Sequence, residues 1–589
     1  MNHWQLEERA RRRRAQEVVC FEKKRAADLR VCLLYPNTYR VAMGNLGFQV
    51  VYELIDREPG VMCERAFLPD PEEIPFAREG ELRSFESATR VSEFDVVAFS
   101  ISFETDYPHV ATLLRLAGLP YWRQARDASY PLVIAGGPAV FLNPEPLADL
   151  VDLFLVGEGE EMVPEFFAVA RSAQWHDRDG LLARVAEAVR GAYVPAHFVP
   201  EFQDERQTGL CYLGPATPRV ERRWVENLDL HPAASRVLSS EAVFGDMVLV
   251  EASRGCQWGC RFCAAGYMYR PLRNRSVESL RASVEEALTR RSTVGLVGAE
   301  MASVPGVDEL ANLAADRGGR LSPSSMKADC VTPSLARALA RGGTRSVTIA
   351  PEAGSERMRC VINKNLTESD ILRAADLLVG EGVQDLKTYF MVGLPTEEDE
   401  DVDAIAALVA KLHRELNGPN GTRRRVGWVT VSVNPFVPKP WTPFQWDPMA
   451  TLPALRHKLR RLKIALARLD HVRLDWESPR EAYYQTLLSR GDRRVAHFLT
   501  AVDRQEGDWW AVIRAWQAGR LGSSAGQELP HPDSYVHRAY GEDELLPWDF
   551  IDHRITKRYL LAERRKAFLG LQTAPCDTST CRSCGACPA

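Results

Sequence analysis

Short, almost continuously apolar runs alternate with amphipathic stretches along the first third of the chain. Five runs predict strands, the last less clearly than the others: 30–35, 94–101, 131–135, 152–156 and 61–66. Near-continuous apolar strands separated by helices are typical of a parallel sheet covered on both faces. We therefore predict a doubly wound domain over residues 30–190, with the flavodoxin-like strand order. Ligands of such a domain lie at the carboxyl ends of the strands.

A second alternation of strands and helices begins at Met247. Six strands are predicted: 247–252, 293–298, a short one near Leu321, 345–350, 385–392 and 428–433. The stretches Thr367–Asp370 and Thr396–Asp399 fit the capping box that starts a helix. Six strand–helix units predict a partial (β/α)6 barrel of the TIM type, open on one side, over residues 240–455. In such barrels chemistry collects at the carboxyl-terminal ends of the strands.

Three further segments complete the predicted organisation. Residues 1–29 form an N-terminal arm, in which Arg11–Arg14 follow Glu7 and Glu8 and are interpreted as a solvated helix face, not as an RNA or membrane patch. Residues 191–239 carry scattered prolines and predict a linker with a hairpin. The charged segment 456–589 predicts a helical region that ends in a group of cysteines.

Composition narrows the class of protein. A chain of 589 residues is long enough for two or three domains. The net charge of −5 gives no electrostatic footprint for nucleic acid. No apolar run of about 18 residues and no apolar signal region appear, so we expect no membrane segment and a cytoplasmic location. Six of the 13 cysteines are scattered as expected for buried thiols in a reducing compartment.

The most informative motif follows the first strand of the predicted barrel. Cys256, Cys260 and Cys263 have C-x3-C-x2-C spacing, with Gly255 and Gly259 beside them. Three thiolates from one short loop are one too few for a closed four-thiolate site, so a [4Fe–4S] cluster held here keeps one iron open for a small ligand. Structural zinc, the alternative, usually takes two separated pairs of ligands, and no second pair lies nearby.

This loop, with Phe262 just before the third cysteine, resembles that of the radical S-adenosylmethionine (SAM) superfamily. The resemblance implies that the open iron chelates the amino and carboxylate groups of SAM, and that one electron splits the sulfonium to give a 5′-deoxyadenosyl radical. Gly298-Ala-Glu300 resembles the Gly-Gly-Glu motif that meets the SAM amino group, with alanine in place of the middle glycine. Further SAM contacts are expected where three later strands end, at Ser324, at Glu352 and Ser355, and at Gly393. The alternative for each is an ordinary strand-to-helix turn.

Phrases spread over nearly the whole chain resemble one cobalamin-binding subfamily of radical SAM proteins. They include Gly136-Gly-Pro138, Ala350-Pro-Glu-Ala-Gly354 and Asn434-Pro-Phe-Val-Pro-Lys439. The resemblance implies an α/β protein in which a cobalamin-binding-type domain precedes a radical SAM barrel and a helical C-terminal region.

The loop after the first strand of that N-terminal domain has no histidine to ligate cobalt, which fits base-off binding. Small residues at the strand ends would leave room for the nucleotide tail of the corrinoid: Ser100, Ser102, Gly136, Gly137, Gly157 and Gly159. The alternative is a domain of this fold that has lost its ligand and serves as a scaffold.

The last fourteen residues hold a second cysteine motif. Cys576, Cys581, Cys584 and Cys587 have C-x4-C-x2-C-x2-C spacing, and Pro588 follows them. The C-x2-C-x2-C run before a proline resembles ferredoxin-type cluster loops. We expect an auxiliary Fe–S cluster here, with a zinc site as the alternative.

The leading functional hypothesis is a radical SAM enzyme that uses cobalamin as a methyl carrier to an unactivated carbon, with flavodoxin or ferredoxin as its electron donor. A second hypothesis is radical rearrangement or oxidation without methyl transfer. A third is a non-catalytic Fe–S protein for electron transfer or redox sensing. The resemblance implies a class of reaction and no particular substrate.

Overall fold

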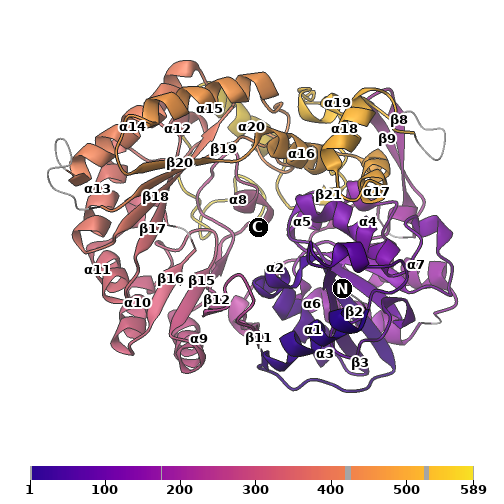
Figure 1. The fold of residues 1–589 in the computed structure, drawn as a ribbon. Helices are drawn as coiled ribbons and strands as arrows, with labels where there is room; N and C mark the ends of the chain where they lie inside the picture. The colour runs from indigo at the N-terminus through magenta and orange to yellow at the C-terminus, as the bar shows by residue number, and fades with distance from the viewer. Residues whose placement is uncertain are drawn as a thin grey trace.

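The computed structural model describes residues 3–173, 175–215, 217–324, 326–417, 426–522 and 529–587. Ser325, inside one predicted SAM-binding stretch, and Pro588, after the last cysteine, lie outside these ranges. Figure 1 shows two lobes side by side, an indigo-to-magenta N-terminal lobe and a pink-to-orange barrel. The yellow C-terminal segment runs between them.

The N-terminal lobe is built on one six-stranded sheet. It contains β2 (Leu29–Thr38), β3 (Val61–Leu68), β4 (Val96–Ser100), β5 (Leu132–Gly136), β6 (Leu153–Leu155) and β7 (Ala192–Tyr193). Their order is β3-β2-β4-β5-β6-β7, and every pair is parallel except β6–β7. The five predicted strands are thus present in the predicted flavodoxin-like order.

Side chains that alternate along these strands pack on both faces of the sheet. Val31 and Leu33 of β2 belong to a core shared with α3 (Leu46–Arg57) and α6 (Gly159–Arg171). Cys32 and Leu34, which point the other way, belong to a core shared with α4 (Tyr107–Leu116). Shorter helices α2 (Tyr39–Met43) and α5 (Pro138–Leu142) follow the carboxyl ends of β2 and β5. Burial on both faces explains the near-continuous apolar runs of the sequence.

The N-terminal arm and the linker are tied into the fold. The arm contains α1 (His3–Ala15) and β1 (Val18–Val19), which pairs with β11 (Val237–Leu238). Arg13 is only partly solvated, because it forms ion pairs with Asp70 (2.7 Å) and Glu241 (2.8 Å). In the linker, β8 (Phe198–Gln203) and β9 (Arg206–Tyr212) form the expected hairpin, and β10 (Val220–Glu221) pairs with β21 (Ile551–Asp552).

The barrel has seven parallel strands, one more than predicted. These are β12 (Met247–Glu251), β15 (Thr293–Val297), β16 (Arg320–Pro323), β17 (Ser346–Glu352), β18 (Asp385–Val392), β19 (Val429–Pro435) and β20 (Val472–Trp476). They form a three-stranded and a four-stranded sheet, and a bridge between Met326 and Ile349 joins the two. β20 lies in the segment that we predicted to be helical. It is a five-residue edge strand with mostly exposed side chains, so it has no apolar run that could have revealed it.

Helices alternate with these strands: α9 (Val277–Arg290), α10 (Val307–Asp316), α11 (Pro333–Arg341), α12 (Glu356–Val361), α13 (Glu368–Gly380), α14 (Asp399–Asn417) and α15 (Leu452–Leu466). The predicted capping box of Thr367 and Asp370 is confirmed at the start of α13. The second one is wrong. Thr396 has a left-handed backbone (φ 65°) unlike that of an N-cap, and α14 begins at Asp399.

The C-terminal helices join the two lobes. They are α16 (Pro479–Arg490), α17 (Ala496–Arg504), α18 (Trp509–Gln517), α19 (Asp533–Val536) and α20 (Lys557–Phe568). Asp503 of α17 pairs with Arg115 of α4 at 2.7 Å, and Arg493 pairs with Glu145 at 2.9 Å. No helix in the described part of the chain combines the length and the apolar character that a membrane span requires.

Candidate functional site

The first cysteine motif lies in a loop of residues 255–268, here called the cysteine loop, that follows the first barrel strand. Its base is closed by an antiparallel pair, β13 (Ser253–Arg254) and β14 (Arg273–Asn274), and its end is α8 (Ala265–Met268). Gly255 has φ 83°, and a Cβ atom there would lie 2.7 Å from the carbonyl oxygen of Tyr269. Glycine is required because the backbone must turn left-handed at this close approach.

The loop brings the thiols of Cys256, Cys260 and Cys263 within electrostatic range of one another. All three are half-buried. Burial raises the pKa of Cys256 to about 12 and that of Cys260 to about 11, so without a metal these thiols stay protonated at neutral pH. Metal ligation displaces such protons. Within the described ranges no three His, Cys, Asp or Glu side chains are arranged to hold a single metal ion. The assignment of a cluster to this loop therefore depends on spacing and surroundings.

Two buried lysines that the sequence did not single out supply positive charge beside the cysteine loop. The Lys364 ammonium lies 3.3 Å from Glu352 and within electrostatic range of Cys260 and Cys263. Lys327 also faces Cys260, and its Nζ lies 3.9 Å from the centre of the Trp258 ring. Both are paired with carboxylates, Lys364 with Glu352 and Lys327 with Asp329 (2.6 Å), as buried lysines usually are. Their positive charge beside the thiols suits a site that receives thiolates and an anionic ligand.

The predicted SAM-binding residues of the first barrel strands lie where these strands end. The Glu300 carboxylate accepts hydrogen bonds from the backbone N–H groups of Ala302 (2.7 Å) and Lys327 (3.2 Å), which ties the loop after β15 to the loop after β16. The Ser324 hydroxyl donates to the carbonyl of Gly298 at 3.0 Å. These hydrogen bonds fix the shape of the barrel edge. They also use part of the hydrogen-bonding capacity of the Glu300 and Ser324 side chains.

Glu352, Ser355 and Gly393 follow the next two strands. Glu352 ends β17 with φ 67°, and burial raises the pKa of its carboxyl while Lys364 opposes the shift. Ser355 is the N-cap of α12 and its hydroxyl donates to Asp401 at 2.6 Å, so its local role is helix capping. The Gly393 N–H donates to Glu397 at 2.7 Å in a left-handed turn (φ 83°). Of the three, Glu352 is the one whose strained backbone and buried charge call for a functional reason.

The carboxyl edge of the N-terminal sheet carries the residues predicted for cobalamin. Ser100 is buried, and the Ser102 hydroxyl accepts a hydrogen bond from Asn45 at 3.0 Å. Just beyond them, Asp106 accepts from Asn37 with one oxygen (2.9 Å), while its buried Oδ2 has no hydrogen-bond partner among the described residues. A buried carboxylate oxygen without a partner is costly, so it points to a polar ligand at this edge.

Local backbone contacts explain most of the glycines at that edge of the sheet. A Cβ at Gly137 would lie 2.5 Å from the Ile101 carbonyl oxygen, and one at Gly157 would lie 2.3 Å from that of Arg223. These two glycines allow backbone segments to touch, so the prediction that they leave room for a nucleotide tail does not fit their surroundings. A Cβ at Gly136 would lie 3.4 Å from the carbonyl oxygen of Leu155, and Gly159 begins α6.

The carboxyl edges of the two lobes face each other. Glu158, after β6, pairs with Arg254 (3.0 Å) and Arg273 (2.7 Å) at the base of the cysteine loop. Glu104, after β4, pairs with Lys439, after β19. Burial opposes ionisation of Glu158, but the two arginines outweigh it and lower its pKa to about 2. The cysteine loop is thus held against the carboxyl edge of the N-terminal sheet.

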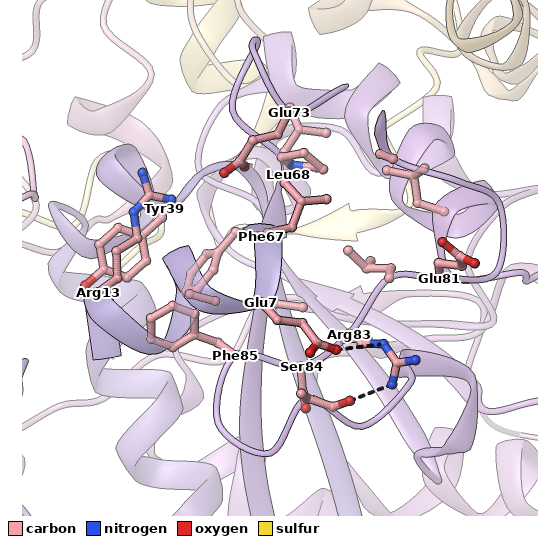
Figure 2. A pocket seen from close by; sticks show the side chains of 18 of the residues that line it. Glu7, Arg13, Tyr39, Phe67, Leu68, Glu73, Glu81, Arg83, Ser84 and Phe85 are labelled. Carbon is pink, nitrogen blue, oxygen red and sulfur yellow. Dashed lines mark hydrogen bonds and ion pairs between the residues drawn. The ribbon is translucent and has the colours of Figure 1, made fainter. Parts of the chain in front are cut away.

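A cavity near the N-terminus is separate from these residues. It measures about 310 Å³ and lies between α1 and the loop that follows β3, lined by Phe67, Leu68 and Phe85 (Figure 2). Glu7 and Arg83 form an ion pair at 3.7 Å beside it. None of the site residues predicted from the sequence lines this cavity.

Comparisons with known proteins agree with this architecture. The model for radical SAM proteins, N-terminal, matches residues 47–195, and the model for the radical SAM superfamily matches residues 250–409. An uncharacterized protein of Methanocaldococcus jannaschii is 28% identical over 471 residues, which cover 80% of this chain and 90% of that protein. Among solved structures, the radical SAM methyltransferase TsrM from Kitasatospora setae, with cobalamin and a [4Fe-4S] cluster bound, matches with TM-score 0.52. The match has 13% identity and covers 83% of this chain and 100% of that one. At that identity the likeness shows the fold.

Proposed function

We propose that this chain is a cobalamin-dependent methyltransferase that acts on an unactivated carbon; the match of residues 250–409 to the radical SAM superfamily supports a radical SAM enzyme. The proposal needs three groups in one place: a [4Fe–4S] cluster, SAM and a corrinoid. The observation that carries it is that the carboxyl edges of the N-terminal sheet and of the barrel face each other across Glu158 and Arg273.

Cys256, Cys260 and Cys263 are the proposed cluster ligands. They are half-buried, lie close together and have Lys364 and Lys327 beside them as positive charges. Bound there, the cluster would supply the electron that cleaves SAM reductively. The chain's own contribution is to exclude water from the thiols, to offset the negative charge of the cluster, and to leave one iron without a protein ligand.

Several carboxyl-end residues of the barrel are proposed to hold SAM. Its ammonium group needs an anion, and Glu352 and Glu300 lie at strand ends beside the cysteine loop. Its carboxylate needs a cation, and Lys364 lies within 3.3 Å of Glu352. Gly298, Ser324 and Gly393 follow β15, β16 and β18 at the same edge of the barrel. Ser355 is not retained in this proposal, because its hydroxyl caps α12.

The corrinoid is proposed to bind at the carboxyl edge of β2, β4 and β5. Support comes from Oδ2 of Asp106, which has no partner in the described part of the chain, and from the polar groups of Ser100, Ser102 and Asn37 at the same edge. The likeness of the fold to TsrM, solved with cobalamin bound, supports the same placement. No protein ligand to cobalt is proposed, and we propose that the cofactor is bound base-off.

Anaerobic purification after expression with added cobalamin tests the proposal. We expect the reconstituted protein to retain corrinoid through gel filtration, with a spin-resonance spectrum free of nitrogen splitting from a lower ligand. Incubation with SAM and a reductant should give both 5′-deoxyadenosine and S-adenosylhomocysteine. Formation of 5′-deoxyadenosine alone, by protein that retains no corrinoid, would favour radical rearrangement or oxidation and leave the N-terminal lobe as a scaffold.

A further inference from the structure

The last four cysteines gather at one place. Cys576, Cys581, Cys584 and Cys587, here called the terminal cysteine motif, lie within electrostatic range of one another, and the thiols of Cys576 and Cys581 are close enough to hydrogen-bond. Cys584 is buried, and its carbonyl accepts a hydrogen bond from the Thr556 N–H at 3.0 Å, at the start of α20. The end of the chain is thus folded back onto a helix. Terminal residues stay ordered only when something ties them down.

The segment before the motif runs directly over the cysteine loop. The Cys576 N–H donates to the carbonyl of Gln257 at 2.8 Å, one residue from Cys256. Asn363 bridges the two segments, because it accepts from the Thr573 N–H (2.7 Å) and donates to the Gly259 carbonyl (3.1 Å). Two cysteine groups more than 300 residues apart in sequence are therefore in backbone contact.

A buried arginine faces the terminal cysteine motif. Arg270 is 4% exposed, and its guanidinium donates to the Gly266 carbonyl (2.9 Å) and the Tyr559 hydroxyl (3.2 Å). Among the described residues no carboxylate pairs with it. The titratable groups within its electrostatic range include Tyr267, Tyr559 and the four thiols of the motif. A buried guanidinium without a carboxylate is costly, whereas four thiolates around a metal centre would provide an anion.

We propose that the terminal cysteine motif holds a second iron–sulfur cluster, with Arg270 as its buried counter-charge, and that this cluster passes electrons to the centre in the cysteine loop. The proposal rests on the proposed function, in that the cysteine loop must hold a cluster to receive the electron. A flavodoxin or ferredoxin would lose one electron, the terminal cluster would be reduced and reoxidised once, and the electron would end in cleavage of one C–S bond of SAM.

Exposure supports this direction of flow. Residues 577–580, 582 and 583 of the motif are exposed, so a donor protein can approach the terminal cluster from outside. The inner side of the motif contacts the cysteine loop through Cys576. The motif therefore lies between solvent and the loop.

Metal content is the first test, on full-length protein reconstituted anaerobically with iron and sulfide. We expect about eight irons per chain in the wild type and about four when the terminal cysteines are all replaced by serine. About four should also remain when Cys256, Cys260 and Cys263 are replaced instead. If the fourfold variant does not fold, Cys581→Ser alone should lower the iron content. Four irons and one zinc in the wild type would overturn the proposal in favour of a structural zinc site.

The reduction potential tests Arg270 separately from any catalysis. In protein whose cysteine loop carries the three serine substitutions, only the terminal cluster titrates. Arg270→Gln should make its midpoint potential more negative, because loss of a nearby positive charge disfavours the reduced, more negative cluster, and Arg270→Lys should restore most of the shift. An unchanged potential in a folded Arg270→Gln variant would remove Arg270 from the proposal.

The relay itself is tested by comparing two reductants. The fourfold serine variant should form 5′-deoxyadenosine at least tenfold more slowly than wild type with reduced flavodoxin, but at a similar rate with dithionite, a small reductant that reaches the loop directly. The relay would be overturned if the variant and the wild type formed 5′-deoxyadenosine at equal rates with flavodoxin. It would also be overturned if the variant lost the same fraction of its rate with both reductants. Absence of SAM cleavage in the wild type with dithionite would instead contradict the proposed function and leave the iron count of the terminal motif as an independent result.

Discussion

The carboxylate of Glu158 lies 2.7 Å from the guanidinium of Arg273, and this ion pair joins the carboxyl edge of the N-terminal sheet to the base of the cysteine loop. Both side chains are buried, Glu158 at 5% exposure and Arg273 at 8%. The same carboxylate pairs with Arg254 on the neighbouring strand of the β13–β14 hairpin. Glu158 therefore controls how the two proposed cofactor sites are placed against each other.

We predict that Glu158→Gln destabilises the protein by about 3–5 kcal/mol, because it leaves buried arginines without their charge partner. Urea unfolding measures the loss. Glu309→Gln is the matched control, since Glu309 pairs with Arg281 at 3.3 Å on the surface, where such pairs contribute about 0–1 kcal/mol. Equal effects of the two substitutions would show that the Glu158 cluster does not hold the lobes together.

Glu158 also predicts how stability depends on pH. Its pKa is about 2 in the folded protein and near 4.5 when unfolded, so its contribution is complete above pH 4.5 and is lost as the pH falls toward 2. A shift of this size corresponds to about 3 kcal/mol at neutral pH. Unfolding free energies measured from pH 6 down to 3 should fall less steeply in Glu158→Gln than in wild type. Parallel curves would contradict a lowered pKa.

Replacing Cys256, Cys260 and Cys263 together by alanine should abolish reductive cleavage of SAM and leave the barrel folded. The physical reason is that these three thiols follow β12 at the carboxyl edge of the barrel, whereas the strands themselves are held by β-pairing and the core. Product analysis with dithionite checks the activity, and circular dichroism checks the fold. Cys330→Ala, which changes a cysteine outside both motifs, is the control. 5′-Deoxyadenosine from the triple variant would show that the cluster lies elsewhere.

Lys364 and Glu352 should behave as one coupled pair. Lys364→Met leaves the Glu352 carboxylate half-buried without its cation, and we expect a loss of about 3–5 kcal/mol in unfolding free energy. The double variant Lys364→Met, Glu352→Gln should regain much of that loss, because both charges are gone. A double-mutant cycle by urea unfolding measures the coupling, and additive effects would contradict it. All variants should bind SAM more weakly when loaded with the cluster.

Gly157→Ala is predicted to destabilise the N-terminal lobe by about 2 kcal/mol or more. Gly157 has φ 133°, and the added Cβ would lie 2.3 Å from the Arg223 carbonyl oxygen. Gly47→Ala in α3 is the control, because its Cβ would meet nothing closer than 3.4 Å and alanine favours a helix. If corrinoid retention changed while stability did not, Gly157 would have the ligand role that its surroundings argue against.

Periodicity and spacing in the sequence determined most of the framework. The apolar runs of β2, β4, β5 and β6 predicted a parallel sheet because strands buried on both faces must be apolar at every position. The cysteine spacings predicted two metal motifs because each set of ligands lies within one short loop. The edge strand β20 was missed, since a strand with exposed side chains has no apolar pattern.

Tertiary structure decided which distant residues meet. Lys364 and Arg270 have charged side chains of the kind that usually lie on the surface. Nothing local in the sequence shows that these two are buried beside cysteines. The contact of Cys576 with Gln257 joins segments more than 300 residues apart. Such contacts depend on the path of the whole chain and on the packing of the two lobes, which a local pattern of apolar and polar residues does not encode.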